Sequence, residues 1–323
     1  MLPGPEDIAA AVARLRAGGL VAFPTETVYG LGADALNEQA VRLVFETKGR
    51  PATNPLIVHV ASPAMARTVV SHWPPEAEAL ARAFWPGPLS LVLPRAPHVP
   101  GVVTAGGPNV AVRCPDHPTA LALIEAFDGP LVGPSANPSG RVSPTTAEHV
   151  RASFDERQVM VLDGGPCRAG IESTVVKLGE GARILRPGLI SAGDIARVLG
   201  RPVQQTSEHA PEQLESPGLL ASHYAPATPL TLCGAHELPA HLRTARRVVV
   251  ISHVPLAVPA SHVLRSMPAD AAAYARELYA ALREADAQGA DRIVVVEPDP
   301  NADGPEGGTW LAVLDRLRRA AAE

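Results

Sequence analysis

The sequence predicts an α/β protein made of two folded units joined by a linker. Short apolar segments of strand length alternate with segments of helix length through the first two-thirds of the chain. A stretch rich in proline and polar residues then breaks this alternation, which resumes after it. The chain has 323 residues, 46% of them apolar, which is enough to bury two cores.

The first unit is expected to alternate strands and helices up to about residue 200. Asn37 suits a helix N-cap, and Ser143 followed by Pro144 suits the cap and first position of another helix. Gly179 and Gly181 mark the turn of a hairpin. The expected strands lie at 19–23, 54–61, 88–94, 109–115, 130–137, 159–165 and 173–188, and the expected helices at 37–50, 63–72, 75–84, 119–129, 143–154 and 192–200.

The second unit follows a linker. Residues 201–229 interrupt every period with proline, glutamine, glutamate and serine, which is typical of a linker. Strands at 230–234, 246–252 and 291–298 then alternate with helices at 270–288 and 309–321, which predicts a small α/β domain. We therefore place a first domain at 1–203, the linker at 204–229 and a C-terminal domain at 230–323.

Composition narrows the class of protein. The net charge of −5 argues against binding to nucleic acid or membranes through a global basic field. No stretch of about 18 apolar residues is present, and the N-terminus lacks the basic segment of a signal peptide, so we expect no membrane contact. Cys114, Cys167 and Cys233 are odd in number and scattered, which favours reduced thiols in the cytoplasm.

Several familiar catalytic patterns do not fit the chain. The Walker sequence G-x-x-x-x-G-K-[ST] does not occur, and Gly133-x-Ser135 lacks the glycine that completes a hydrolase elbow. His236 and His241 are five residues apart rather than four, and Pro239 is expected to break a helix between them. We therefore expect no metal site built from protein side chains alone.

Polar residues gather in three loops. PTETVYGLG (24–32) offers the hydroxyls of Thr25 and Thr27, with glycines that allow a ligand close to the backbone. TKGRPATNPL (47–56) combines a lysine, an arginine and an amide in seven residues, a composition that suits a polyphosphate clamp. VGPSANPSGRVSPTT (132–146) lies between a strand end and a helix start, where hydroxyls and amides favour an anion.

Each feature alone also fits an ordinary structural role. The first loop is also typical of a polar turn, and Lys48 and Arg50 also complement the dipole of a helix C-terminus. His59, inside the apolar LIVHV, also fits a hydrogen-bonded core histidine. Asn109 and Arg113 share one face of an alternating strand, where solvent exposure is the alternative to ligand binding.

Taken together, these stretches resemble the YrdC-type threonylcarbamoyl-AMP synthases in their long, two-domain form. The resemblance rests on PTETVYGLG, KGRPATNPL, SANPSGRVSPT, STVV, LRPG and SPGLLASHYAP, which come in order, and on the C-terminal LDRLRRAA. It implies a twisted mixed α/β sheet with a large concave basin, followed by a small Rossmann-like domain. It also implies a nucleotidyl transfer in which L-threonine, bicarbonate or CO₂, and ATP give threonylcarbamoyl-AMP and pyrophosphate.

The resemblance also implies partners and residue roles. Downstream proteins would pass the threonylcarbamoyl group to tRNA adenosine, and Mg²⁺ would accompany ATP rather than occupy a cage of its own. Tyr224 would fold the linker over the basin as a lid. L-Threonine would be held by Thr27, His59, Arg113 and Ser173, with Arg113 on the carboxylate. ATP would be held by the catalytic Lys48 and Arg50, with Asn54, Asn109, Ser135, Asn137, Ser143, Arg186 and Tyr224. Asn109 stands where relatives have a hydroxyl residue.

Two other functions remain open at this point. A non-catalytic double-stranded RNA or tRNA-binding module would use the same basin, with a local arginine patch giving a weak tRNA contact despite the net charge. A carbamoyl-transfer domain of a hydrogenase-maturation enzyme ranks below it. The chain lacks the zinc-finger and acylphosphatase segments that accompany such domains.

Overall fold

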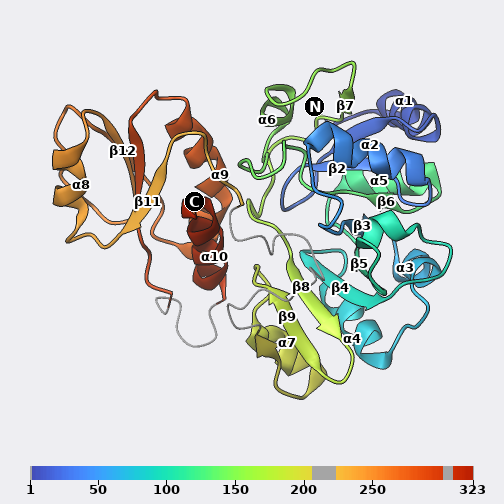
Figure 1. Ribbon diagram of the computed structural model, residues 1–323. Coiled ribbons are helices and arrows are strands. Elements are labelled where there is room, and N and C mark those ends of the chain that lie inside the picture. Colours follow the sequence, from blue (N-terminus) through green and yellow to red (C-terminus); the bar gives the residue numbers. More distant parts are fainter. Residues whose placement is uncertain (1, 206–222, 301–307, 323) are drawn as a thin grey trace.

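Two sheets organise the chain, one in each of two units that lie side by side (Figure 1). The computed structural model describes residues 2–205, 223–300 and 308–322. Within these ranges the larger sheet has ten strands in the order β10-β9-β8-β4-β5-β3-β6-β2-β1-β7, with parallel and antiparallel neighbours. The smaller sheet has the order β11-β14-β12-β13 and is parallel throughout. The expected fold class, a mixed α/β sheet followed by a small Rossmann-like domain, is confirmed.

The elements of the larger unit largely follow the expected alternation. Its helices are α1 (Pro5–Arg16), α2 (Glu38–Lys48), α3 (Pro63–Val69), α4 (Pro75–Phe84), the 3₁₀ helix η1 (Gly101–Thr104), α5 (Pro118–Phe127), α6 (Ala147–Arg151) and α7 (Ala192–Leu199). Its strands are β1 (Leu20–Phe23), β2 (Gly30–Asp34), β3 (Ile57–His59), β4 (Leu89–Pro94), β5 (Asn109–Arg113), β6 (Leu131–Val132), β7 (Val159–Val161), β8 (Thr174–Leu178), β9 (Ala182–Arg186) and β10 (Gln204–Gln205). The hairpin β8–β9 and the Asn37 cap, which accepts from two backbone N–H groups, are confirmed.

Three local expectations were wrong. Gly30 and Gly32 lie in β2 rather than in a loop, and a Cβ on Gly32 would lie 2.8 Å from the Val21 carbonyl oxygen. Gly32 therefore serves close strand packing. Helix α6 begins after Thr146, whose side chain accepts from His149 N, so Ser143 is not its cap. The two-residue β10 lies in the expected linker and pairs with β9, because parallel backbone pairing continues the large sheet there.

The smaller unit is built from β11 (Leu230–Cys233), α8 (Leu238–Thr244), β12 (Val248–Ser252), β13 (Val263–Ser266), α9 (Ala271–Asp286), β14 (Arg292–Val296) and α10 (Thr309–Ala321). Helices α9 and α10 lie on the side of the small sheet that faces the larger unit, and α8 lies on the far side (Figure 1). No helix carries both His236 and His241, as expected: α8 begins at Leu238, with Pro239 in its first turn, where a missing N–H costs nothing.

The two units share a buried core. Val28, Val142 and Ile171 of the larger unit pack in one cluster with side chains of α9 and α10. The backbones also approach closely, since a Cβ on Gly170 would lie 2.3 Å from the Ala275 carbonyl oxygen of α9. No helix in the described part of the chain is long and apolar enough to cross a membrane. The shared core fixes the second unit against the loops that carry the predicted site.

Candidate functional site

A cavity lies where the three polar loops meet, with about 490 Å³ of space free of protein atoms, part of it open to solvent. Its lining combines hydroxyl groups, three guanidinium groups, two imidazoles, a phenol and one carboxylate. The described lining residues are Thr25, Thr27, Val28, Gly30, Arg50, Ile57, His59, Arg113, Gly133, Pro134, Ser135, Glu172, Arg186, His223 and Tyr224. Such a set suits an anionic, hydrogen-bonding ligand.

The structure brings most of the predicted site residues to this cavity or directly behind it. Thr27, Arg50, His59, Arg113, Ser135, Arg186 and Tyr224 line it. Lys48, Asn54, Asn137, Ser143 and Ser173 are buried, and most of them contact a lining residue. Asn109 begins β5, does not line the cavity, and is the predicted residue that this geometry leaves apart.

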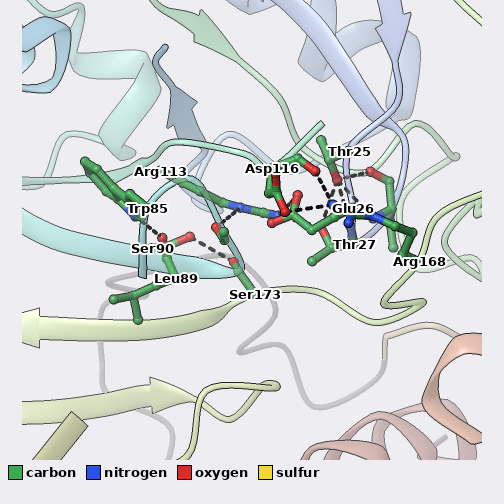
Figure 2. Close-up of polar contacts among 12 residues, drawn as sticks. Thr25, Glu26, Thr27, Trp85, Leu89, Ser90, Arg113, Asp116, Arg168 and Ser173 are labelled. Carbon is green, nitrogen blue, oxygen red and sulfur yellow. Dashed lines mark hydrogen bonds and ion pairs between the residues drawn. The ribbon is translucent and has the colours of Figure 1, made fainter. Parts of the chain in front are cut away.

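Arg113 is held in a fixed orientation by three groups (Figure 2). Its register opposite His59 in the β3–β5 pair places it beside the first loop. Nη1 donates to Thr27 Oγ1 at 2.9 Å, Nε donates to the Gly87 carbonyl at 3.2 Å, and Nη2 forms a 2.7 Å ion pair with Glu26. Each guanidinium nitrogen is engaged by one of these groups, which leaves one N–H on Nη1 and one on Nη2 for a ligand carboxylate.

Lys48 anchors the third polar loop, residues 132–146, through its side chain. Its Nζ donates to the Ser135 carbonyl at 2.5 Å and to the Asn137 carbonyl. The Lys48 carbonyl in turn accepts from Ser139 N at 2.8 Å. Burial, and then the charge of Arg50, hold the pKa of Lys48 well below its usual range. The side chain that we expected on ATP phosphates therefore contacts the loop, and the loop presents Ser135 to the cavity.

Arg50 and Asn54 form a second buried arrangement. Arg50 donates from Nε to the Asn54 carbonyl at 3.1 Å and from Nη2 to the Pro55 carbonyl at 2.9 Å. Burial lowers the pKa of Arg50 to about 9, with the charge of Arg186 acting in the same direction. The Asn54 side chain is fully buried and its amide has no hydrogen-bond partner within the described residues. Buried polar groups normally have partners, so this amide is a candidate ligand contact.

Ser173 connects the threonine set to the nucleotide set of predicted residues. Its hydroxyl shares a 2.8 Å hydrogen bond with Ser90 and accepts from Arg186 Nη2 at 3.1 Å (Figure 2 shows the serine pair). Arg186 also donates from Nε to the Ser173 carbonyl at 3.1 Å. Ser173 therefore fixes the direction of an arginine that lines the cavity.

The histidines of the cavity are neutral at physiological pH. Burial, and then the charge of Arg113, lower the pKa of His59 to about 3. Burial also lowers the pKa of His223 to about 3. Neither imidazole can serve as a cation, so the positive charge of the cavity comes from arginines. Tyr224, stacked on Tyr279 with ring centroids 5.6 Å apart, presents a buried hydroxyl without a partner in the described part of the chain.

Glu172 is the acidic side chain among the described lining residues, and both of its oxygens are engaged. Oε1 accepts from Ser143 at 2.7 Å, and Oε2 accepts from Tyr279 at 2.8 Å and from Arg316 at 3.0 Å. Burial would raise its pKa, but Arg316, Arg186 and these hydrogen bonds outweigh burial and lower the pKa to about 2. No group of three or more His, Cys, Asp or Glu side chains that could hold a metal ion is found within the described ranges.

Sequence reasoning gave no role to Glu26, Glu172 or His223, although each lies in or directly beside a motif that carries the family resemblance. Glu26 and Glu172 were hidden because a carboxylate near an anion site looks unfavourable until its arginine partner is known. In Glu172 the partner is Arg316, 144 residues away. The signal for Glu172 in the sequence was the E-S-T order, with an acid directly before two hydroxyl residues.

Comparisons with known proteins match this architecture. The Sua5/YciO/YrdC family model, described as "Telomere recombination", matches residues 13–188, and the model "Threonylcarbamoyl-AMP synthase, C-terminal domain" matches residues 190–322. Curated proteins named threonylcarbamoyl-AMP synthase from Pyrococcus abyssi and Bacillus subtilis are each 42% identical; the matches cover 95% and 98% of this chain and 92% and 93% of theirs.

Solved structures also match this chain. The crystal structure of P. abyssi Sua5 complexed with L-threonine is 40% identical and superposes with a TM-score of 0.89, over 97% of this chain and 94% of that one. Escherichia coli YciO, 22% identical with a TM-score of 0.52, shares the fold over 58% of this chain and 91% of its own. This chain therefore belongs to the Sua5/YciO/YrdC family, in the long form that carries the threonylcarbamoyl-AMP synthase C-terminal domain.

Proposed function

We propose that this chain synthesises L-threonylcarbamoyl-AMP from L-threonine, bicarbonate or CO₂, and ATP, with release of pyrophosphate. The observation that carries the proposal is one cavity shared by Arg50, Arg113 and Arg186 together with the hydroxyls of the first and third loops. The relatives that match nearly the whole chain are named for this reaction, and they support the synthase rather than a non-catalytic RNA-binding module.

The threonine end of the cavity is built around Arg113. Its remaining Nη1 and Nη2 N–H groups suit the amino-acid carboxylate, with Thr27 beside them. His59 lines the same wall, and its buried Nδ1 has no hydrogen-bond partner within the described residues. Because His59 is neutral, it can exchange a hydrogen bond with threonine without adding charge. Ser173, behind this wall, keeps the neighbouring Arg186 in place.

The nucleotide end is built around Arg50 and Arg186. Burial lowers the pKa of both, which means that each charge is poorly solvated. A triphosphate would replace the missing solvation, so anion binding and charge burial support each other. Lys48, Asn137 and Ser143 support the loop that presents Ser135, and the unpartnered side-chain amide of Asn54 is available to the ligand. Tyr224 lines the cavity from within the expected linker, which supports its role as the lid residue.

The chemistry requires positioning more than acid–base catalysis. The threonine amine adds to CO₂ and loses a proton, or condenses with bicarbonate with loss of water, to give a carbamate. A carbamate oxygen then attacks the α-phosphorus of ATP, the bond from the α-phosphorus to its bridging oxygen breaks, and pyrophosphate leaves. The substrates supply the nucleophile, so the chain's task is to align them and to balance the charge that builds up at the phosphates. Mg²⁺ is best treated as a companion of the ATP substrate, because both oxygens of Glu172 already accept hydrogen bonds.

The proposal also covers the proteins that consume the product and the cellular compartment. The adenylate is reactive, so proteins that transfer the threonylcarbamoyl group to tRNA would consume it, with at most a weak tRNA contact to this chain. A cytoplasmic site agrees with the free thiols of Cys114, Cys167 and Cys233.

Pyrophosphate release by the full-length protein tests the proposal. Release should require L-threonine, bicarbonate and Mg²⁺-ATP together, and mass spectrometry should find threonylcarbamoyl-AMP. Pyrophosphate release that does not depend on threonine would reject the reaction. Binding of tRNA with a steep salt dependence and no nucleotide turnover would favour the RNA-binding alternative instead.

A further inference from the structure

The second unit contributes to the wall of the site through one buried carboxylate. Glu172 belongs to the larger unit and lines the cavity, yet two of its three side-chain partners come from the second unit. Tyr279 of α9 donates to Oε2 at 2.8 Å, and Arg316 of α10 donates to the same atom at 3.0 Å. Arg316 also donates from Nη2 to the Glu172 carbonyl at 3.2 Å, so it fixes backbone and side chain together.

The same two side chains pack against Tyr224. The Tyr279 ring stacks on the Tyr224 ring at an interplanar angle of 28°, and the Arg316 guanidinium lies 5.6 Å from the Tyr224 ring centroid. The side chain of Arg316 is 0% exposed and is also paired with Asp315 at 2.7 Å. A fully buried arginine is costly unless its charge is matched, so this geometry is strongly constrained.

Ser143 connects Glu172, and with it the second unit, to the nucleotide end of the cavity. The Ser143 hydroxyl donates to Oε1 of Glu172 at 2.7 Å, and Arg283 of α9 donates to the carbonyl of Val142, next to Ser143. A carboxylate whose Oε2 is held by two donors cannot rotate freely, so its Oε1 presents a fixed acceptor to Ser143. The loop that carries Ser135 and Ser143 is thereby tied to α9 and α10.

We infer that Tyr279 and Arg316 are positioning residues of the second unit, which hold Glu172 and through it Ser143 at the nucleotide end of the site. The second unit would then complete the ATP site and would not be an independent module. This inference rests on the proposed function, because it takes the anion that Arg50 and Arg186 face to be ATP.

Two tyrosine-to-phenylalanine variants on one helix provide a matched test. Tyr279→Phe removes the hydroxyl that donates to Glu172 and keeps the ring that stacks on Tyr224. Tyr274→Phe makes the same chemical change on α9, where the Tyr274 hydroxyl is buried and has no hydrogen-bond partner in the described part of the chain. Both changes remove one buried oxygen and keep the ring, so a loss of analogue binding in Tyr279→Phe alone would trace to the hydrogen bond with Glu172 rather than to the removal of a buried oxygen as such.

Calorimetric binding of α,β-methylene-ATP to the full-length protein is the measurement, because that analogue cannot be cleaved at the reacting bond. Tyr279→Phe should weaken its binding about tenfold, equal to about 1.4 kcal/mol, while Tyr274→Phe leaves it unchanged. Threonine affinity should stay unchanged in both variants. In a Ser143→Ala background, Tyr279→Phe should weaken analogue binding by less than about threefold, because residues acting through one contact are not additive.

Three results would overturn the inference. The first is equal analogue affinity in the two phenylalanine variants. This result overturns the inference even if Tyr279→Phe has a lower melting temperature, because the hydroxyl would then serve stability and not ATP binding. The second is a full tenfold effect of Tyr279→Phe in the Ser143→Ala background. The third is a wild-type protein that binds no analogue, which would reject the proposed function as well. A wild-type protein that binds the analogue but releases no pyrophosphate rejects the reaction alone, and the two variants still decide the inference.

Discussion

Replacing Arg113 by methionine should separate the structural role of this residue from its role with substrate. Methionine keeps much of the side-chain length but removes the charge and every donor. The change takes away a 2.7 Å ion pair with Glu26 and a 2.9 Å hydrogen bond to Thr27. It therefore leaves Glu26 as a buried carboxylate without its cation, and it removes the fork that we assign to the threonine carboxylate.

The structural cost follows from burial. The Arg113 and Glu26 side chains are 4% and 6% exposed. Removing one partner of such a pair costs about 3–5 kcal/mol, because the remaining charge stays buried and unpaired. At about 2–4 °C per kcal/mol for a folded unit of 150–250 residues, the melting temperature should fall by roughly 6–20 °C. Adding Glu26→Gln removes the unpaired charge and should recover most of that loss.

The loss of threonine binding should persist in the double variant. Hydrogen bonds to a charged group contribute about 1.5–3 kcal/mol, so the KM for threonine should rise roughly 10–100-fold in the single and the double variant alike. Calorimetric melting and threonine-dependent pyrophosphate release measure the two effects separately. A double variant that regains both stability and threonine KM would refute the reasoning, since Arg113 would then act only as the partner of Glu26.

Three further predictions follow from buried contacts. Glu172→Gln should lower the free energy of unfolding by on the order of 3 kcal/mol at pH 7, since the folded pKa of about 2 lies below the ordinary 4.5. A depressed acid contributes stability above its unfolded pKa and loses it as the pH falls through the folded value, so urea titrations should show the difference shrinking between about pH 4.5 and pH 2; a constant difference would contradict this. Gly170→Ala should lower the melting temperature clearly more than Gly165→Ala. Both glycines have φ near 80°, so the backbone strain of the substitution is similar. A Cβ at Gly170 would lie 2.3 Å from the Ala275 carbonyl oxygen, whereas a Cβ at Gly165 would meet nothing within 4 Å. Equal losses would show that the interface adapts. Lys48→Ala should lower kcat/KM for ATP at least about tenfold with the circular dichroism spectrum retained, because the third loop loses its anchor; near-normal ATP kinetics would remove Lys48 from the site.

Local signals alone were sufficient for much of the fold. Alternating apolar segments predicted most strands and helices, and the short-range chemistry of Asn37 and of the Gly179–Gly181 turn was read correctly because caps and turns depend on neighbours in sequence. The same reasoning failed for β2, where glycines chosen for close packing against β1 look like loop residues. It also failed at Ser143, whose hydroxyl donates to Glu172 instead of capping a helix.

The sequence by itself determined which residue types the site contains, because loops that combine hydroxyls, Lys48, Arg50 and amides have the composition of an anion-binding site wherever they lie in space. Tertiary structure alone decided which of them face the cavity. In the folded chain Lys48 and Ser173 lie behind the lining residues, and Asn109 does not line the cavity. Glu172 of the larger unit accepts a hydrogen bond from Arg316 of the second unit. The reason is physical: a charge can be buried only where a partner meets it, and such partners come from segments that are distant in sequence and are brought together by packing of the core.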